Sequence, residues 1–430
     1  MASKAPIESS ATQPVSSCGA AISKPLASWS KKLSNQWRAL GCGMRAHEHR
    51  AGVAYGSLGD SIRTALIGRS HSTSPMRGLM KAIARGRRDL ALGEFEASDI
   101  SWIVESGLGP SCFHAAQENR ANTDSPHWRM LQAADLTARV VAADHAEAVI
   151  EILGTAAGRV PRMTLLKGIS LADKVYPEFH LRPMRDVDLL VDRDSVASME
   201  SVLRELGYEQ RSASDAAFYD HHHHTMPFFH AEKNVWVEVH HGLMAPRSRA
   251  SRDALFAPAS VQREMRASSF QGKTVCRLSA ELELVYLAAH WAQDFKSVGG
   301  MVALIDLIHL LRAALPRLCW EKILSWLERS ASAHYLYLAL SYLARRGWID
   351  LPADLLLRLG RARLGRGEFS IHAAHALIDR YLLDGESFSR WLSQRNLAIA
   401  WKTLILPAPE LCKLMLIPFN LCTPEGLRFD

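Results

Sequence analysis

The sequence has few cysteines and no long apolar run, and both absences narrow what the protein can be. Its seven cysteines are scattered over 430 residues, are odd in number and never form a Cys-x-x-Cys pair. This pattern argues against a disulfide framework and against a cysteine-based zinc site, so we expect a reducing, cytoplasmic location. The most apolar stretch, residues 399–419, is interrupted by charged residues and prolines, so we expect no membrane span.

Basic charge is concentrated at the start of the chain and is scarce elsewhere. The formal net charge is +7, but residues 1–88 hold 14 Lys and Arg against 3 Asp and Glu, so this part carries +11 and the rest −4. The acid-poor start, rich in Ser, Ala and Gly, predicts a disordered basic leader over residues 1–78. Its composition also matches an organelle transit peptide, but we favour an unstructured leader or an extended translation start. Because the remainder is slightly acidic, nucleic acid is not the expected partner.

The length of the chain indicates more than one domain. With 430 residues, of which 48% are hydrophobic, it exceeds the usual size of a single core. Apolar residues at helical spacing predict a helical segment over 79–158. Strand patterns and polar motifs fall within 159–262, which we assign to the core domain. From about residue 275 onward the pattern is almost wholly helical, and we assign residues 263–430 to a C-terminal helical domain.

Two carboxylates lie on one face of a predicted strand near residue 188. Side chains alternate along a strand, so Asp186 and Asp188 point the same way, about 7 Å apart. A second predicted strand, 235–240, carries Glu238, which would lie across from them if the two strands pair. Three clustered acids persist when cations neutralise them, and oxygen ligands favour Mg²⁺ or Mn²⁺. The simpler alternative is a strand end with two acids in a solvated turn.

A glycine turn upstream has the composition of a phosphate-binding segment. A short buried strand leads into Lys167 and Gly168, and Ser170 with Asp173 fits the Ser-x-x-Asp pattern of a helix N-cap. Free amides at such a helix start favour triphosphate oxygens, whereas the alternative is an ordinary strand-to-helix turn. Lys167 is either a phosphate contact or a solvated lysine. Arg182 is a candidate phosphate or substrate clamp because its guanidinium binds oxyanions in a fork.

Four consecutive histidines, 221–224, suggest a metal site at first sight. On an extended chain, neighbouring side chains point to opposite sides, so all four cannot face one ion. No matched Cys or acid spacing accompanies them, which argues against a dedicated zinc site. His223 and His224 are candidates to line a substrate cleft, with a polar edge strand as the alternative. His240 lies two residues beyond Glu238 on the same face, so we expect it to touch the acidic cluster.

These motifs occur in the order found in a known family. They comprise 166–171, Tyr176 with Pro177, 182–191, 221–227 and 237–240. In this combination the chain resembles the uncharacterised nucleotidyltransferase family labelled NTP_transf_5, which belongs to the polymerase-beta-like nucleotidyltransferase superfamily. The resemblance extends over roughly residues 80–420.

The resemblance implies an α+β fold with a small mixed sheet flanked by helices. It places Asp186, Asp188 and Glu238 where the superfamily has its metal-binding acids, and it implies transfer of a nucleotide from an NTP to an unknown acceptor. That acceptor is a small molecule, a saccharide, a peptide or a protein. In related two-domain enzymes the helical part often shapes the acceptor pocket, which makes Asp306 a candidate contact. The superfamily's glycine signature stands shortly before its acid pair, whereas Gly168 stands farther upstream, so the alternative is a catalytically impaired nucleotide-binding or regulatory protein.

Overall fold

The computed structural model describes residues 75–85, 95–118, 123–212, 216–246, 248–293, 299–328, 330–362 and 368–383. All of them belong to one compact unit that spans residues 53–430. Most of the predicted leader and the stretch 399–419 lie outside the described residues. Helix α3 (Pro75–Arg85) begins before residue 78, where the leader was expected to end, because Met76, Leu79 and Met80 are buried in the core.

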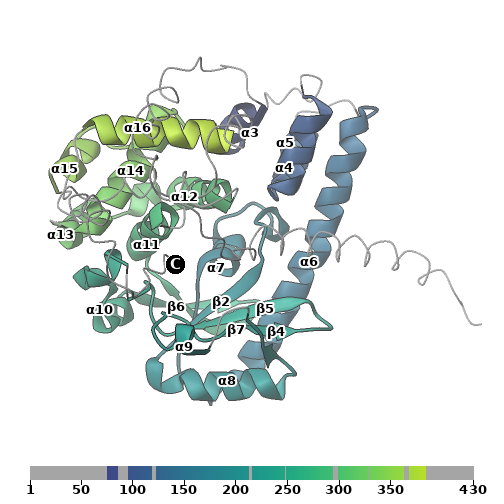
Figure 1. Ribbon diagram of the computed structural model, residues 1–430, viewed down its shortest axis with the longest axis vertical. Coiled ribbons are helices and arrows are strands. Elements are labelled where there is room, and N and C mark those ends of the chain that lie inside the picture. The colour runs from purple at the N-terminus through teal and green to yellow at the C-terminus, as the bar shows by residue number, and fades with distance from the viewer. Residues whose placement is uncertain are drawn as a thin grey trace, which may run out of the picture. The chain divides into compact units, whose positions relative to one another are not determined.

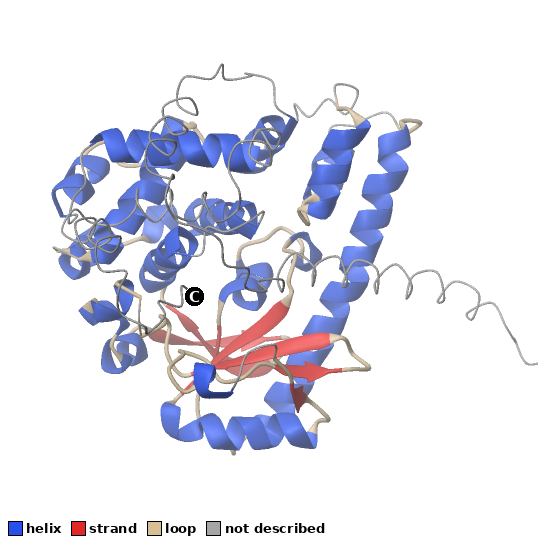
Figure 2. Cartoon of the chain, in the orientation of Figure 1, coloured by secondary structure: helices blue, strands red, loops and turns tan. Residues whose placement is uncertain are grey.

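The described strands form one sheet of seven strands, shown in red in Figure 2. In chain order they are β1 (Met163–Leu165), β2 (Asp186–Val191), β3 (Glu209–Gln210), β4 (Phe228–His230), β5 (Val235–His240), β6 (Met265–Phe270) and β7 (Lys273–Leu278). Their order across the sheet is β3-β4-β5-β2-β1-β7-β6. The pairs β2–β5 and β1–β7 are parallel and the others antiparallel. The predicted α+β class with a mixed sheet is confirmed.

Helices precede, connect and follow the strands (Figure 1). The N-terminal ones are α3, α4 (Ala97–Glu105), α5 (Gly109–Glu118) and α6 (Pro126–Ala156). Those between strands are α7 (Lys167–Lys174), α8 (Val196–Glu205), α9 (Ala216–Tyr219) and α10 (Pro258–Arg263). The C-terminal ones are α11 (Ala280–Gln293), α12 (Gly299–Ala314), α13 (Trp320–Leu327), α14 (Ala331–Arg345), α15 (Leu355–Ala362) and α16 (Glu368–Ile378). Short 3₁₀ turns occur at Phe179–Leu181, Arg193–Ser195, Ala250–Arg252, Ala254–Phe256 and Leu315–Arg317, and a π-helical turn at Asp379–Leu383.

The two faces of the central strands differ in chemistry. Val187 and Leu189 of β2 and Val237 of β5 pack against buried residues of α6 and α8 in one apolar cluster. Their alternation with polar neighbours sends the carboxylates to the opposite face. Figure 1 shows α8 beneath the sheet and α7 and α11 above it. The sheet therefore has one apolar face, covered by α6 and α8, and one face that carries polar groups.

The hairpin β6–β7 was missed by the sequence analysis. It lies within 263–430, which was assigned to helices, and it extends the sheet because β7 pairs with β1. Gln271 and Gly272 connect the two strands with φ of 48° and 78°. Two central residues with positive φ form the type of turn that matches the twist of a two-residue hairpin.

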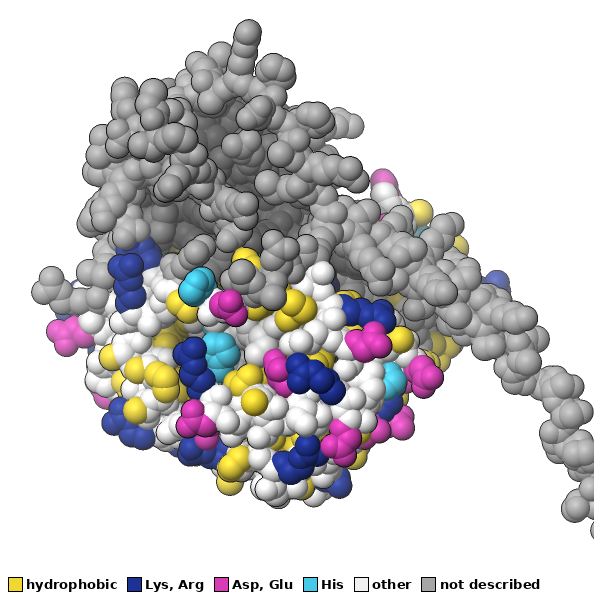
Figure 3. Space-filling model, turned by 60° about the horizontal axis from the view of Figure 1, so that its bottom comes forward, with side chains coloured by type: hydrophobic (Ala, Val, Ile, Leu, Met, Phe, Trp, Pro, Cys, Tyr) yellow, Lys and Arg dark blue, Asp and Glu magenta, His cyan; other side chains and the backbone are white. Residues whose placement is uncertain are grey.

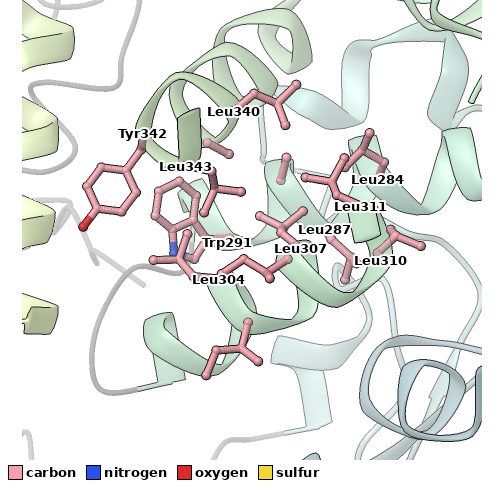
Figure 4. Packing of buried hydrophobic residues seen from close by; sticks show 14 of the residues in the cluster. Leu284, Leu287, Trp291, Leu304, Leu307, Leu310, Leu311, Leu340, Tyr342 and Leu343 are labelled. Atoms are coloured by element: carbon pink, nitrogen blue, oxygen red, sulfur yellow. The ribbon is translucent and has the colours of Figure 1, made fainter. Parts of the chain in front are cut away.

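The C-terminal helices pack around a large apolar core. Figure 4 shows leucines of α11, α12 and α14 interdigitating around the buried Trp291. This part of the prediction, a C-terminal helical region, is confirmed. Among the described helices, none combines the length and the apolar character that a membrane crossing requires.

Candidate active site

The acids of β2 and β5 meet because the two strands pair in parallel. In the register Asp188 lies opposite Glu238, and Asp186 lies opposite Trp236. The Asp188 side chain is only 3% exposed. The pairing that the sequence analysis required for a three-carboxylate cluster is therefore present in the sheet, on the face that α6 and α8 leave uncovered.

Two cationic groups contact the most buried acid of this cluster. Oδ1 of Asp188 accepts hydrogen bonds from Nζ of Lys167 at 2.9 Å and from Nε2 of His240 at 2.8 Å. The same His240 nitrogen lies 3.4 Å from Oε2 of Glu238. Lys167 follows β1 with a φ of 44°, a left-handed conformation that non-glycine residues rarely adopt. This unusual backbone turns the lysine toward Asp188, so it is not a solvated strand-end residue.

The electrostatics of the three carboxylates are unequal. Burial, followed by the neighbouring Asp188 and Glu238 charges, raises the pKa of Asp186 to about 7. Burial also opposes ionisation of Asp188, but Lys167 and His240 outweigh it and lower the pKa of that carboxyl. Burial disfavours the charged form of His240, yet its hydrogen bonds to Asp188 and Glu238 raise its pKa. The cluster thus carries more acid than its two cations neutralise.

This donor set fits a divalent cation. Asp188, Glu238 and His240 each have a potential ligand atom, the imidazole after it loses its proton, and these atoms all lie within 4.8 Å of one another. Carboxylate oxygens are the ligands that Mg²⁺ and Mn²⁺ prefer. Asp186 lies on the same face of β2 and adds a third carboxylate. A cation bound here would also relieve the repulsion that, in addition to burial, raises the pKa of Asp186.

The histidine run does not adopt the extended conformation on which the sequence analysis relied. Residues 220–223 form turns and bends, and His224 then makes a single antiparallel bridge to His240. As a result, ring nitrogens of His222, His223 and His224 lie within 4.8 Å of one another. The extended conformation assumed for the run is therefore wrong, because three of its side chains converge. His221 is exposed and outside this group, so the four histidines do not all meet at one point.

Two histidines of this loop lie beside the acidic cluster. Nε2 of His224 is 3.8 Å from Oε2 of Glu238. The ring of His223 lies 5.1 Å from that of His240. Burial, followed by the surrounding imidazoles, lowers the pKa of His223, and burial also lowers the pKa of His224. Both rings are thus neutral, which leaves a nitrogen lone pair for a ligand or a proton.

Ser170 does not cap a helix. Helix α7 begins three residues earlier, at Lys167, with Leu166 as its N-cap, so Ser170 lies inside the helix and is buried. Its hydroxyl and its carbonyl accept hydrogen bonds from Nη1 of Arg277 at 2.9 and 2.7 Å. Nη2 of the same arginine donates to Asp173 at 2.7 Å. Both residues of the predicted Ser-x-x-Asp motif thus hold Arg277 of β7, a partner that no local pattern could reveal.

The predicted clamp Arg182 is occupied by an acid of the same chain. Its Nε donates to Oδ1 of Asp306 at 3.0 Å and its Nη2 to Oδ2 at 2.7 Å. The hydroxyl of Tyr176 donates to the same Oδ1 at 2.7 Å. Asp306 was considered as an acceptor contact, but it lies on α12 and binds the arginine fork. A Cβ on Gly168 would lie 2.7 Å from Nη1 of Arg182, so the glycine makes room for this side chain.

The architecture is that of a mixed α+β protein with an acidic cluster at paired parallel strands. The model of the uncharacterised nucleotidyltransferase family matches residues 99–346, which is more than half of the chain and includes the acidic cluster, the histidine loop and the Arg182–Asp306 pair. The chain therefore belongs to this family. No match was found among curated proteins or among solved structures.

Proposed function

We propose that the protein is a metal-dependent nucleotidyltransferase that moves an NMP from an NTP to an acceptor hydroxyl or similar group. The observation that carries this proposal is the register that sets Asp188 opposite Glu238 in a member of a nucleotidyltransferase family. The acceptor oxygen attacks the α-phosphorus, the bond to the β-phosphate breaks, and pyrophosphate leaves with the bonding electrons while the acceptor loses its proton. Positioning and charge neutralisation supply the catalysis in such transfers.

Asp186, Asp188 and Glu238 would hold Mg²⁺ or Mn²⁺, which supplies neutralisation of phosphate charge and a lower pKa for the acceptor hydroxyl. Lys167 and His240 fix the orientation of Asp188 through their hydrogen bonds. Triphosphate binding is assigned to Lys167 and to the amide of Gly168 at the start of α7. The polar groups of Arg182 and Ser170 bind Asp306 and Arg277, respectively. In this proposal the two residues stabilise the start of α7.

The proposal includes an NTP as substrate and an acceptor that is a small molecule, a saccharide, a peptide or a protein. Figure 3 shows a face on which the described Lys and Arg side chains are interspersed with Asp and Glu, which does not favour a nucleic-acid partner. Cys112, Cys276 and Cys319 are free thiols, in keeping with the proposed cytoplasmic location.

One observation favours a second candidate, a nucleotide-binding or regulatory protein that has lost turnover. Lys167 and His240 already occupy Oδ1 of Asp188, and Asp306 already fills the fork of Arg182. A protein in which these internal partners persist would bind nucleotide without transferring it.

The experiment that separates the two incubates the full chain with each labelled NTP, Mg²⁺ or Mn²⁺, and a metabolite and protein extract. We expect pyrophosphate release and a product that is heavier by one nucleoside monophosphate. The Asp186→Ala, Asp188→Ala double variant should form no product, whereas Asp192→Asn, just beyond the same strand, should retain it. NTP binding by calorimetry without pyrophosphate release would favour the second candidate. Equal transfer by the double variant would refute the metal mechanism.

A further inference from the structure

Four imidazoles gather at the end of β5, and the proposed transfer reaction does not need all of them. The ring centroid of His222 lies 4.4 Å from that of His223 and 4.2 Å from that of His224. His223 and His224 each lie 5.1 Å from His240. So many imidazole rings in one place contribute little packing that apolar residues could not supply better.

The backbone of the loop is fixed to β5 at several points. The amide of Thr225 donates to the carbonyl of Val239 at 2.9 Å, and the amide of His241 donates to the carbonyl of His223 at 2.9 Å. At the other end of the turn, the amide of His222 donates to the carbonyl of Tyr219 at 3.0 Å. These bonds hold the turn that lets three consecutive side chains converge. Preorganised ligands bind a metal with a smaller loss of conformational entropy.

One ring nitrogen in this group is buried without a hydrogen-bond partner among the described residues. Nδ1 of His223 is buried and has no hydrogen-bond partner within the described part of the chain. A buried polar atom without a partner is destabilising. Because one ring nitrogen from each of the three consecutive histidines lies within 4.8 Å of the others, a single ion can contact all three.

We infer that His222, His223 and His224 form a second metal site, selective for a transition-metal ion such as Zn²⁺. Imidazole nitrogen suits Zn²⁺, Co²⁺ and Ni²⁺, whereas Mg²⁺ prefers oxygen, so this site and the carboxylate cluster select different ions. The two groups share no ligand. Zn–N bonds of about 2.0–2.1 Å require the three nitrogens to close around the ion.

Three protein ligands leave a coordination position for water or for a substrate oxygen. The site is adjacent to the acidic cluster, because Nε2 of His224 lies 3.8 Å from Oε2 of Glu238. Metal binding at this loop would therefore fix its position beside Glu238. The inference does not depend on the proposed transferase activity, since metal binding is measurable in its absence.

The test uses the full chain, purified without a polyhistidine tag and stripped of metal. Zn²⁺ is titrated by calorimetry, and Co²⁺ by its visible absorption bands, which report nitrogen ligation. Wild type and His221→Ala should bind one equivalent, because His221 is exposed and outside the group. His223→Ala should weaken binding at least about tenfold. Asp188→Asn should keep the tight Zn²⁺ site, and excess Mg²⁺ should not displace Co²⁺.

Each of three results would overturn the inference. The first is no Zn²⁺ binding by wild type. The second is unchanged affinity in folded His223→Ala, with folding checked by circular dichroism. The third is loss of the ion in Asp188→Asn but not in the histidine variant, which would place the metal in the carboxylate cluster. If His223→Ala does not fold, His222→Gln provides the same comparison with a polar side chain of similar length.

Discussion

The acidic cluster and the Arg182–Asp306 pair are both buried groups of charges, but they are balanced differently. In the cluster, three carboxylates of β2 and β5 face one lysine and one histidine. In the pair, one guanidinium meets one carboxylate in a fork with two hydrogen bonds. A matched pair needs no further partner, whereas an excess of one sign in a buried place calls for a ligand of the other sign. The first arrangement indicates a binding site and the second a structural link.

Removing one acid of the cluster should produce the largest effect and should leave the fold intact. Asp186→Asn keeps the shape of the side chain but removes a proposed metal ligand, so we expect the proposed nucleotide transfer to fall by about 10³-fold or more. Because the change also removes repulsion by Asp188 and Glu238, thermal unfolding of the metal-free protein should occur at the same or a higher temperature. If the variant instead unfolds at a much lower temperature, Asp186 has a structural role, and the contrast between the cluster and the Arg182–Asp306 pair does not hold.

Removing the acid of the matched pair should mainly destabilise the fold. Asp306→Asn leaves Arg182 buried without its counter-charge, which typically costs about 3–5 kcal/mol of unfolding free energy. The exposed pair of Arg85 and Asp350 is the control, since the Asp350 side chain is 83% exposed. Asp350→Asn should therefore cost less than about 1 kcal/mol. Denaturant unfolding of both variants checks this, and equal losses would contradict a special role for the buried pair.

The faces that carry the acids of the cluster could be predicted from the sequence because local rules determine them, whereas the pairing of β2 with β5 entered only as a condition. Alternation along β2 sets Asp186 and Asp188 on one face, and the apolar pattern of β5 fixes which side of that strand carries Glu238. Arg182 and Ser170 were assigned to phosphate because their types suit it, but their actual partners lie 124 and 107 residues away in sequence. No periodicity encodes such pairings. The histidine loop was misjudged for a related reason, since its turn depends on hydrogen bonds to β5.

Glu283 is a buried carboxyl near the Arg182–Asp306 pair, and it makes the stability of the protein depend on pH. Burial raises the pKa of Glu283 to about 7, and the neighbouring Arg277 offsets this only in part. Between the ordinary carboxyl pKa and this raised value, the unfolded chain binds fewer protons than the native one, so unfolding free energy falls as pH rises. Glu283→Gln should remove this loss. Its stability advantage over wild type should grow from about pH 5 to about pH 8, to at most about 3 kcal/mol. Urea unfolding at both pH values measures the advantage, and an advantage that does not grow would be evidence against the buried ionisation.

The smallest effect is expected where the two regions meet, at Gly168 between Lys167 and the fork of Arg182. A Cβ there would lie 2.7 Å from Nη1 of Arg182 and 3.0 Å from Cγ of Met184. Gly168→Ala should therefore cost about 1–3 kcal/mol through overpacking, less the roughly 1 kcal/mol that alanine gains in a helix. In the control, Gly78→Ala on α3, the new Cβ meets nothing within 4 Å, so this variant should be neutral or slightly stabilising. If Gly168→Ala instead weakens NTP binding at unchanged stability, the glycine makes room for the nucleotide rather than for Arg182. Gly168 would then belong to the proposed nucleotide site and not to the structural link.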